Sequence, residues 1–375
     1  VAIYTQNSDR QVQSIAYSTD NGRSFTKYEN NPVLTSDARD FRDPKVFWHK
    51  ETQRWIMLLA VGQEMQIFSS SNLKDWAFES SFGEGQGAHG GVWECPDLFE
   101  LPVDGTNEKK WVLLCNLNPG GPFGGSATQY FVGTFNGKEF VNESPSKTKW
   151  MDWGKDHYAT VTWSDAPDNR RIAIAWMSNW QYANDVPTSQ YRSPNSVPRD
   201  LSLFTVDGET YLQSAPSPEL LKLRDISKKR SFKVNGTRTI KDMIAGNEGA
   251  YEIELTIENQ HADVIGFRLY NDKGEEVDMQ YDMKEKKFSM DRRKSGEVGF
   301  NENFPMLTWT TIESGKDELK LRLFVDKSSV EAFGDGGRFV MTNQVFPSEP
   351  YTHIDFYSKG GAYKVDSFVI YKLKK

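Results

Sequence analysis

One glutamate in this sequence stands where a carboxyl group could serve as a general acid. Glu94 follows Trp93 and precedes Cys95-Pro96, at the entry of an apolar strand. Partial burial in such surroundings raises the pKa of a carboxyl group toward the range in which it donates a proton at neutral pH. Glu94 is therefore the first candidate for a catalytic residue.

A second stretch repeats the first. Segments 41–48 and 93–100 lie 52 residues apart, and in each of them three residues precede a proline, which is followed by one charged residue and then by apolar residues. The alignment places Arg42 and Asp43 over Glu94 and the cysteine after it, so the polar groups of two equivalent strands could face one pocket. Paired carboxyl groups around a sugar are what glycoside hydrolysis requires. The alternative is that Arg42 and Asp43 form a structural ion pair and that Glu94 is a capped turn residue.

The composition excludes several classes of partner and ligand. The net charge of −7 and the absence of a Lys/Arg run argue against nucleic acid or an anionic membrane. No apolar run approaches the roughly 18 residues of a membrane span. The histidines and cysteines lack metal-ligand spacing and the glycines match no nucleotide-binding fingerprint, so we expect no metal and no cofactor. Aromatic residues make up 13% of the chain, including 11 Trp, which suits stacking on sugars as well as packing in sheets.

The elements that must position these residues are short β-strands. Alternating segments flank an Asn-Gly turn within 15–28, which predicts a hairpin. Four strands then recur about every 50 residues, with a third copy expected over 130–176, and this period is typical of a β-propeller blade. Three to four blades fit before residue 206, and the chain opens inside a strand at 1–5. We therefore expect a propeller that lacks its first blade.

The pattern changes after residue 213. Ser217 and Pro218 predict the start of a short helix, and farther on the strands alternate cleanly, as in Leu319, Leu321, Leu323 and Val325. We expect a propeller domain over 1–213, a linker over 214–228, and a jelly-roll-like β-sandwich without chemistry of its own over 229–375.

Three motifs resemble the signatures of the family-32 glycoside hydrolases, which include invertases, inulinases and levanases. They are 41–48, 93–99 and Trp-Met-Ser-Asn-Trp-Gln-Tyr at 176–182. The resemblance continues through 323–331, covers the whole chain and looks closest to bacterial levanases. It implies an all-β chain, with a five-bladed propeller joined to a β-sandwich. The implied reaction releases β-D-fructofuranosyl units from fructans (levan, inulin) or sucrose with retention of configuration.

The resemblance also implies residue roles. Glu94 matches the general acid/base, and Asp43 matches the residue that binds fructose hydroxyls and stabilises the transition state. Further positions match residues that line the fructose pocket: Arg42, Trp176, Trp180 and Asp156. One departure is His157, which stands where the family usually has Phe.

The family's nucleophile is an aspartate in a Trp-Met-Asn-Asp-Pro-Asn-Gly segment of the first blade, and this sequence has no such segment. We therefore expect that this chain alone does not complete the reaction, and that an upstream part carries the signal peptide of an extracellular enzyme. Three alternatives stay open: a fructosyltransferase with the same residues, a non-catalytic fructan-binding protein, and a kelch-like interaction propeller. The sequence carries no signal for an oligomeric state.

Overall fold

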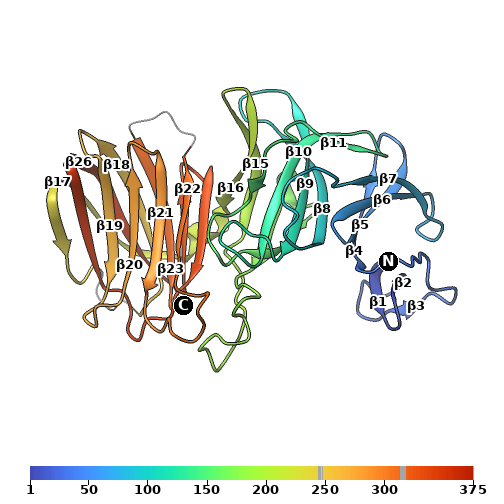
Figure 1. Cartoon of the computed structure of the whole chain (residues 1–375), viewed down its shortest axis with the longest axis horizontal. Helices are drawn as coiled ribbons and strands as arrows, with labels where there is room; N and C mark the ends of the chain where they lie inside the picture. Colours follow the sequence, from blue (N-terminus) through green and yellow to red (C-terminus); the bar gives the residue numbers. More distant parts are fainter. Residues whose placement is uncertain (244–245, 247, 313–317, 375) are drawn as a thin grey trace.

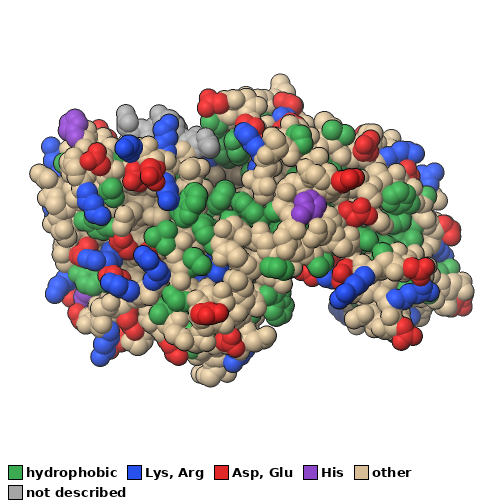
Figure 2. Space-filling view, viewed as in Figure 1, with side chains coloured by type: hydrophobic (Ala, Val, Ile, Leu, Met, Phe, Trp, Pro, Cys, Tyr) green, Lys and Arg blue, Asp and Glu red, His purple; other side chains and the backbone are tan. Residues whose placement is uncertain are grey.

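The structure is a computed structural model, and it describes residues 1–243, 246, 248–312 and 318–374. Its regular secondary structure is almost entirely β-strand. Figure 1 shows two bodies side by side, a set of small sheets from the first half of the chain and a β-sandwich from the second half. Among these residues, no helix has the length and apolar character needed to cross a membrane. Acidic and basic side chains are interspersed on the face shown in Figure 2.

The propeller part consists of antiparallel sheets whose strands follow one another in sequence, and four such sheets lie within the described residues. The first two are formed by β1 (Ala2–Asn7), β2 (Gln11–Tyr17) and β3 (Thr26–Lys27), and by β4 (Phe41–His49), β5 (Arg54–Val61), β6 (Glu64–Ser70) and β7 (Ala77–Phe82). The third sheet contains β8 (Val92–Pro102), β9 (Lys109–Asn118), β10 (Ala127–Phe135), β11 (Phe140–Asn142) and β12 (Lys149–Trp150). The fourth contains β13 (Tyr158–Trp163), β14 (Ile172–Trp176), β15 (Arg199–Val206) and β16 (Glu209–Pro216).

The predicted hairpin within 15–28 is confirmed, because β2 and β3 pair in antiparallel register. The predicted third copy over 130–176 is wrong in its grouping. Strand β10 pairs with β9 from Ala127 to Gly133 and so completes the third sheet, and the next sheet begins at β13. The first propeller sheet, β1–β3, is therefore followed by the sheets β4–β7, β8–β12 and β13–β16.

The sandwich is one hydrogen-bonded sheet of ten strands that folds around a single core. Its strands are β17 (Arg224–Ile240), β18 (Tyr251–Asn259), β19 (Val264–Tyr270), β20 (Glu276–Asp282), β21 (Lys287–Lys294), β22 (Leu307–Thr311), β23 (Glu318–Asp326), β24 (Ser329–Gly334), β25 (Phe339–Gln344) and β26 (His353–Leu373). Strand β26 pairs with β19 over 353–359 and with β18 over 363–372, so it joins the two halves of the sandwich.

Strand β23 shows why this sequence forms a sandwich next to another body. The alternating residues Leu319, Leu321, Leu323 and Val325 are all buried in the sandwich core, as the pattern predicts. Phe324 points to the opposite face but is also buried, because it packs with Phe333 and with Val197 of the propeller part. The propeller therefore covers one outer face of the sandwich.

The connection between the two bodies is shorter than the predicted linker 214–228. Strand β16 continues to Pro216, and β17 already begins at Arg224. Between them lies a short 3-10 helix, Pro218–Leu223, with Ser217 at its N-cap position as predicted. The Ser217 hydroxyl does not cap this helix but donates to Asp200 at 2.5 Å. A second 3-10 helix spans Pro167–Asn169.

Candidate active site

The first strands of three neighbouring sheets share one irregularity. Strands β4, β8 and β13 each contain a β-bulge, and it directly follows Arg42, Glu94 and Tyr158 respectively. The next residue in each strand has a positive φ: Asp43 at 60°, Cys95 at 43° and Ala159 at 52°. A bulge redirects the side chains beside it. The structure thus confirms the equivalence of segments 41–48 and 93–100, and it adds β13 as the third copy.

Of the three residues before the bulges, Glu94 lies in the middle and contacts the other two. Arg42 Nη2 donates to Glu94 Oε1 at 2.8 Å, and the Tyr158 hydroxyl donates to Glu94 Oε2. The side chain of Glu94 is 23% exposed, so the carboxyl group is held on both oxygens and still reaches solvent. A carboxyl group in this setting can exchange a proton with a bound ligand.

Arg42 is a fixed positive charge at this site. Its Nη1 atom lies 2.6 Å from Asp40 Oδ1, so the guanidinium bridges Asp40 and Glu94. Burial opposes the charge of Arg42, but its hydrogen bonds to Glu94 and Asp40 outweigh that cost and raise the pKa of Arg42. The guanidinium therefore stays charged and orients the Glu94 carboxyl group.

Asp43 joins the same two strands at the level of the backbone. Its Oδ2 atom accepts a hydrogen bond from Cys95 N at 2.9 Å, and its own N–H donates to Thr5 Oγ1 at 3.1 Å. Asp43 is half-buried and adjoins Glu94 through the neighbouring residue of β8. Burial, followed by the negative charge of Asp43, raises the pKa of the Cys95 thiol, so this cysteine stays protonated and is a poor nucleophile.

Two tryptophans form a wall next to Tyr158. Trp176 lies opposite Tyr158 in the register of β13 and β14, and their ring centroids are 6.1 Å apart. Trp180 lies against Trp176 with centroids 4.9 Å apart, and 51% of its surface is exposed. Exposed aromatic rings have apolar faces on which a sugar can stack. The structure therefore brings the predicted residues Trp176 and Trp180 to the same site as Glu94.

The two halves of the chain match two models of one family. Residues 1–216 match the glycosyl hydrolases family 32 N-terminal domain, and residues 219–372 match the glycosyl hydrolases family 32 C-terminal model. This chain belongs to glycosyl hydrolase family 32. The family fold is a β-propeller joined to a β-sandwich, as the sequence predicts.

Curated relatives of this family 32 chain include bacterial and fungal proteins. It is 46% identical over 386 residues to a levanase of Bacillus subtilis (strain 168), across 100% of this chain and 57% of that protein. It is 37% identical over 397 residues to a levanase of Bacillus sp. (strain L7), of which it spans 43%. An extracellular exo-inulinase of Aspergillus awamori is 36% identical over 397 residues, across 98% of this chain and 73% of that protein. The chain thus spans about half the length of the two levanases.

Solved structures show the same fold. The exo-inulinase from Aspergillus awamori superposes on all of this family 32 chain with a TM-score of 0.90 at 33% identity, and the match covers 79% of that chain. A fructofuranosidase from Schwanniomyces occidentalis, solved in complex with fructose, superposes with a TM-score of 0.88 at 33% identity and is covered to 78%.

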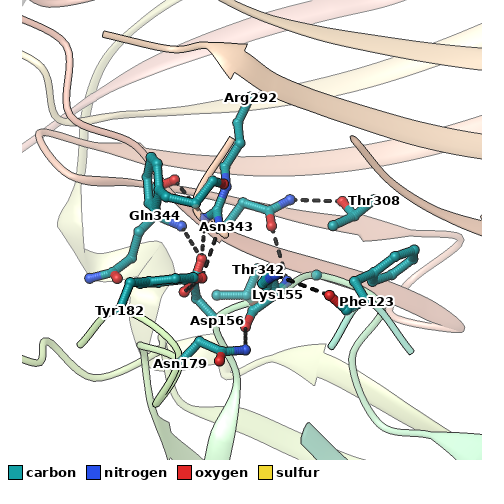
Figure 3. Close-up of polar contacts among 12 residues, drawn as sticks. Phe123, Lys155, Asp156, Asn179, Tyr182, Arg292, Thr308, Thr342, Asn343 and Gln344 are labelled. Atoms are coloured by element: carbon teal, nitrogen blue, oxygen red, sulfur yellow. Dashed lines mark hydrogen bonds and ion pairs between the residues drawn. The ribbon is translucent and has the colours of Figure 1, made fainter. Parts of the chain in front are cut away.

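The structure does not place Asp156 in the pocket. Its side chain has no exposed surface, and it lies where the propeller meets the sandwich, with its carboxylate paired with Arg292 (Figure 3). The Tyr182 hydroxyl also donates to Asp156, at 2.5 Å. A carboxylate with these partners is already satisfied and cannot reach a sugar. The expectation that Asp156 lines the fructose pocket is therefore wrong.

The sequence motifs do not mark Tyr158 as a site residue. The signal that could have found it is the hairpin register, because Tyr158 lies directly opposite the predicted pocket residue Trp176. Within the described part of the chain, no three His, Cys, Asp or Glu side chains are grouped so that they could hold a metal ion. The side chains described at this site offer carboxyl groups, a guanidinium, a phenol hydroxyl and aromatic rings.

Proposed function

We propose that this family 32 chain carries the acid/base and sugar-binding part of a retaining glycoside hydrolase site. Its substrates would be fructans such as levan and inulin, together with sucrose, from which it releases β-D-fructofuranosyl units. The observation that carries the proposal is the Glu94 carboxyl group, held by Arg42 and Tyr158 where three bulged strands meet. Relatives named levanase and exo-inulinase support the substrate class.

The proposed reaction has two displacements. In the first, a carboxylate of the enzyme attacks the anomeric carbon of the fructosyl unit while Glu94 gives its proton to the departing glycosidic oxygen, so that the glycosidic bond breaks. In the second, Glu94 takes a proton from water, the water oxygen bonds to the same carbon, and the enzyme carboxylate leaves. Asp43 would bind ring hydroxyls while positive charge develops on the sugar.

The residues at the site suit these roles. Arg42 and Tyr158 fix the direction of the Glu94 carboxyl group, and geometric fixing of this kind supplies much of the rate of enzymatic reactions. Trp176 and Trp180 would stack on the fructosyl ring. By the resemblance, the attacking residue is the aspartate of a Trp-Met-Asn-Asp segment, which this sequence does not contain. Activity should therefore be measured with this chain and with the full reading frame that encodes it.

The test is release of reducing sugar from levan, inulin and sucrose. We expect Glu94→Gln to lower kcat by about 10²- to 10⁴-fold, because that is the usual contribution of a general acid/base. Glu100→Gln is the matched control, since Glu100 lies on the same strand and pairs with Lys109 at the surface. Turnover that survives Glu94→Gln would refute the assignment.

Product analysis separates the remaining alternatives. Oligosaccharides longer than the substrate, formed at high sucrose concentration, would identify a fructosyltransferase that uses the same residues. Binding of fructan in a calorimeter without any hydrolysis by the full reading frame would identify a non-catalytic binding protein. We also propose an extracellular location, because fructans are polymers and several relatives are named extracellular exo-inulinases.

A further inference from the structure

Three buried side chains form a polar cluster between the propeller and the sandwich, close to the Trp176–Trp180 wall. We call Asp156, Tyr182 and Arg292 the Arg292 cluster (Figure 3). All three side chains are almost completely buried. Arg292 Nη1 pairs with Asp156 Oδ2, Arg292 Nη2 donates to the Tyr182 hydroxyl at 2.8 Å, and that hydroxyl donates to Asp156 Oδ1 at 2.5 Å. Each member therefore bonds to both others.

The sandwich holds this cluster from two strands. Arg292 lies on β21, and its Nε and Nη1 atoms donate to the carbonyl oxygens of Phe304 at 2.8 Å and Gln344 at 3.1 Å. Strand β25 contributes the N–H of Gln344, which donates to Asp156 Oδ2 at 2.8 Å. The Asp156 N–H in turn donates to the carbonyl oxygen of Thr342 at 3.1 Å. The position of Asp156 is thus set by the sandwich backbone.

On the other side, the cluster holds the segment that carries the tryptophan wall. Trp180 lies between Asn179 and Tyr182 in the sequence. The Tyr182 N–H donates to the carbonyl oxygen of Asn179 at 3.0 Å and so closes a turn around Trp180. The Asn179 side chain donates to the carbonyl oxygen of Lys155 at 3.0 Å, directly before Asp156. Both ends of this turn are therefore tied to residues 155–156. Two residues farther along the chain, Tyr158 donates to Glu94.

We infer that Arg292, Asp156 and Tyr182 are positioning residues through which the sandwich orients the Trp176–Trp180 wall and the Tyr158–Glu94 contact. Charge-assisted, fully paired hydrogen bonds in a buried site fix direction as well as distance. The part of the inference that concerns sugar binding rests on the proposed function. The sandwich then has a role in substrate binding although none of these residues touches the substrate.

The decisive variant is Tyr182→Phe. It keeps the ring, which packs against Phe304 at 5.3 Å between centroids, and removes only the hydroxyl that joins Asp156 and Arg292. The matched control is Tyr363→Phe, because the Tyr363 hydroxyl is also buried and donates to the carbonyl oxygen of Gly266 at 3.0 Å inside the sandwich. Arg292→Lys is the second variant. It keeps a positive charge but loses the forked guanidinium.

In the full reading frame, we expect Tyr182→Phe to lower kcat/KM for levan and sucrose by about fivefold, mainly through KM, because one buried hydrogen bond is typically worth that factor. Tyr363→Phe should lower the melting temperature about as much as Tyr182→Phe does, but it should not change KM. A merely structural role of Tyr182 predicts equal effects of the two variants, and equal effects would overturn the inference.

A second measurement does not depend on activity. In the chain labelled with 5-fluorotryptophan, the ¹⁹F resonances of Trp176 and Trp180 can be assigned from Trp→Phe variants. We expect both resonances to shift or broaden in Tyr182→Phe and Arg292→Lys but not in Tyr363→Phe. Unchanged resonances in the folded variants would refute the positioning role. If the full reading frame releases no sugar, the proposed function fails, and the resonances still decide the inference.

Discussion

Tyr158 shows how a single residue connects two parts of the site. Its hydroxyl donates to Glu94, and its ring faces Trp176 on the neighbouring strand. The side chain itself is buried. A change at Tyr158 would therefore disturb Glu94 and the Trp176–Trp180 wall together.

His157, next to Tyr158, gives a prediction about acid stability. Burial, followed by the positive charge of Arg199, lowers the pKa of His157 to about 3. In the unfolded chain a histidine takes up a proton near pH 6.5. Between these two values the unfolded state binds more protons than the folded state, so stability is retained above about pH 6.5 and falls as the pH decreases.

We expect His157→Phe to remove the loss of folding stability that the parent chain shows below about pH 6.5. The free energy of unfolding of the parent chain should fall by roughly 2 kcal/mol more than that of the variant between pH 7 and pH 5, since one pH unit corresponds to about 1.4 kcal/mol. Urea denaturation over this pH range measures the difference. His261→Gln, at an exposed histidine, is the control. Parallel curves for the parent and His157→Phe would contradict the prediction.

At the scale of elements, the repeated bulge explains why residues from three strands meet. Each bulge breaks the strand register and turns the preceding side chain toward the same place. A hydrogen bond also joins the bulge of β4 to β8, because Asp43 accepts from Cys95 N. The geometry of the site is therefore stabilised by contacts between sheets as well as within them.

Two substitutions at Asp43 should show how much its hydrogen bond to Cys95 and its positive φ matter for stability. Asp43→Ala loses the bond to Cys95 N and places alanine at a φ of 60°, so we expect a loss of about 2–3 kcal/mol in the free energy of unfolding. Asp43→Asn keeps an acceptor and tolerates this φ, so its loss should stay below about 1 kcal/mol. Chemical denaturation of both variants is the measurement. Equal losses of stability would contradict a stabilising role of the Asp43–Cys95 hydrogen bond.

The same bulges show how far the sequence could be interpreted. Segments 41–48 and 93–100 were recognisable as copies because each has Pro after the residue of positive φ. The third copy has Ala159-Thr160 at that place, so no sequence pattern marks it, and the expected copy falls at the wrong strand. Asp156 could not be placed because its partner Arg292 lies 136 residues later, in the other domain.

At the scale of the whole molecule, a second buried network joins the two bodies. Arg199, at the start of β15, has no exposed surface and pairs with Asp152 and with Glu331 of the sandwich, each at 2.9 Å. It also donates to Thr342 Oγ1 at 2.6 Å. One guanidinium thus compensates two buried carboxylates that lie on different bodies.

We expect Arg199→Met to destabilise the chain by about 3–5 kcal/mol, because it leaves buried carboxylates without a counter-charge. We expect the propeller and the sandwich of this variant to melt in separate calorimetric transitions, and the parent chain to melt in one. Arg10→Met is the control, since Arg10 and Asp37 form a surface pair of the kind that contributes less than about 1 kcal/mol. A single transition at the parent temperature in Arg199→Met would contradict the prediction.

The long strand β26 sets the order in which parts of this protein can fold during its synthesis. Residue Arg224 of β17 pairs with Leu373 of β26, so β17 keeps an unpaired edge until the ribosome has delivered that distant segment. At ordinary rates of synthesis the interval is on the order of ten seconds. The propeller sheets leave the ribosome during the earlier part of translation, without the sandwich strands that anchor Asp156. During synthesis, Glu94 and the strands around it are therefore complete well before the sandwich strands that hold Asp156 and, through it, the segment of Trp180.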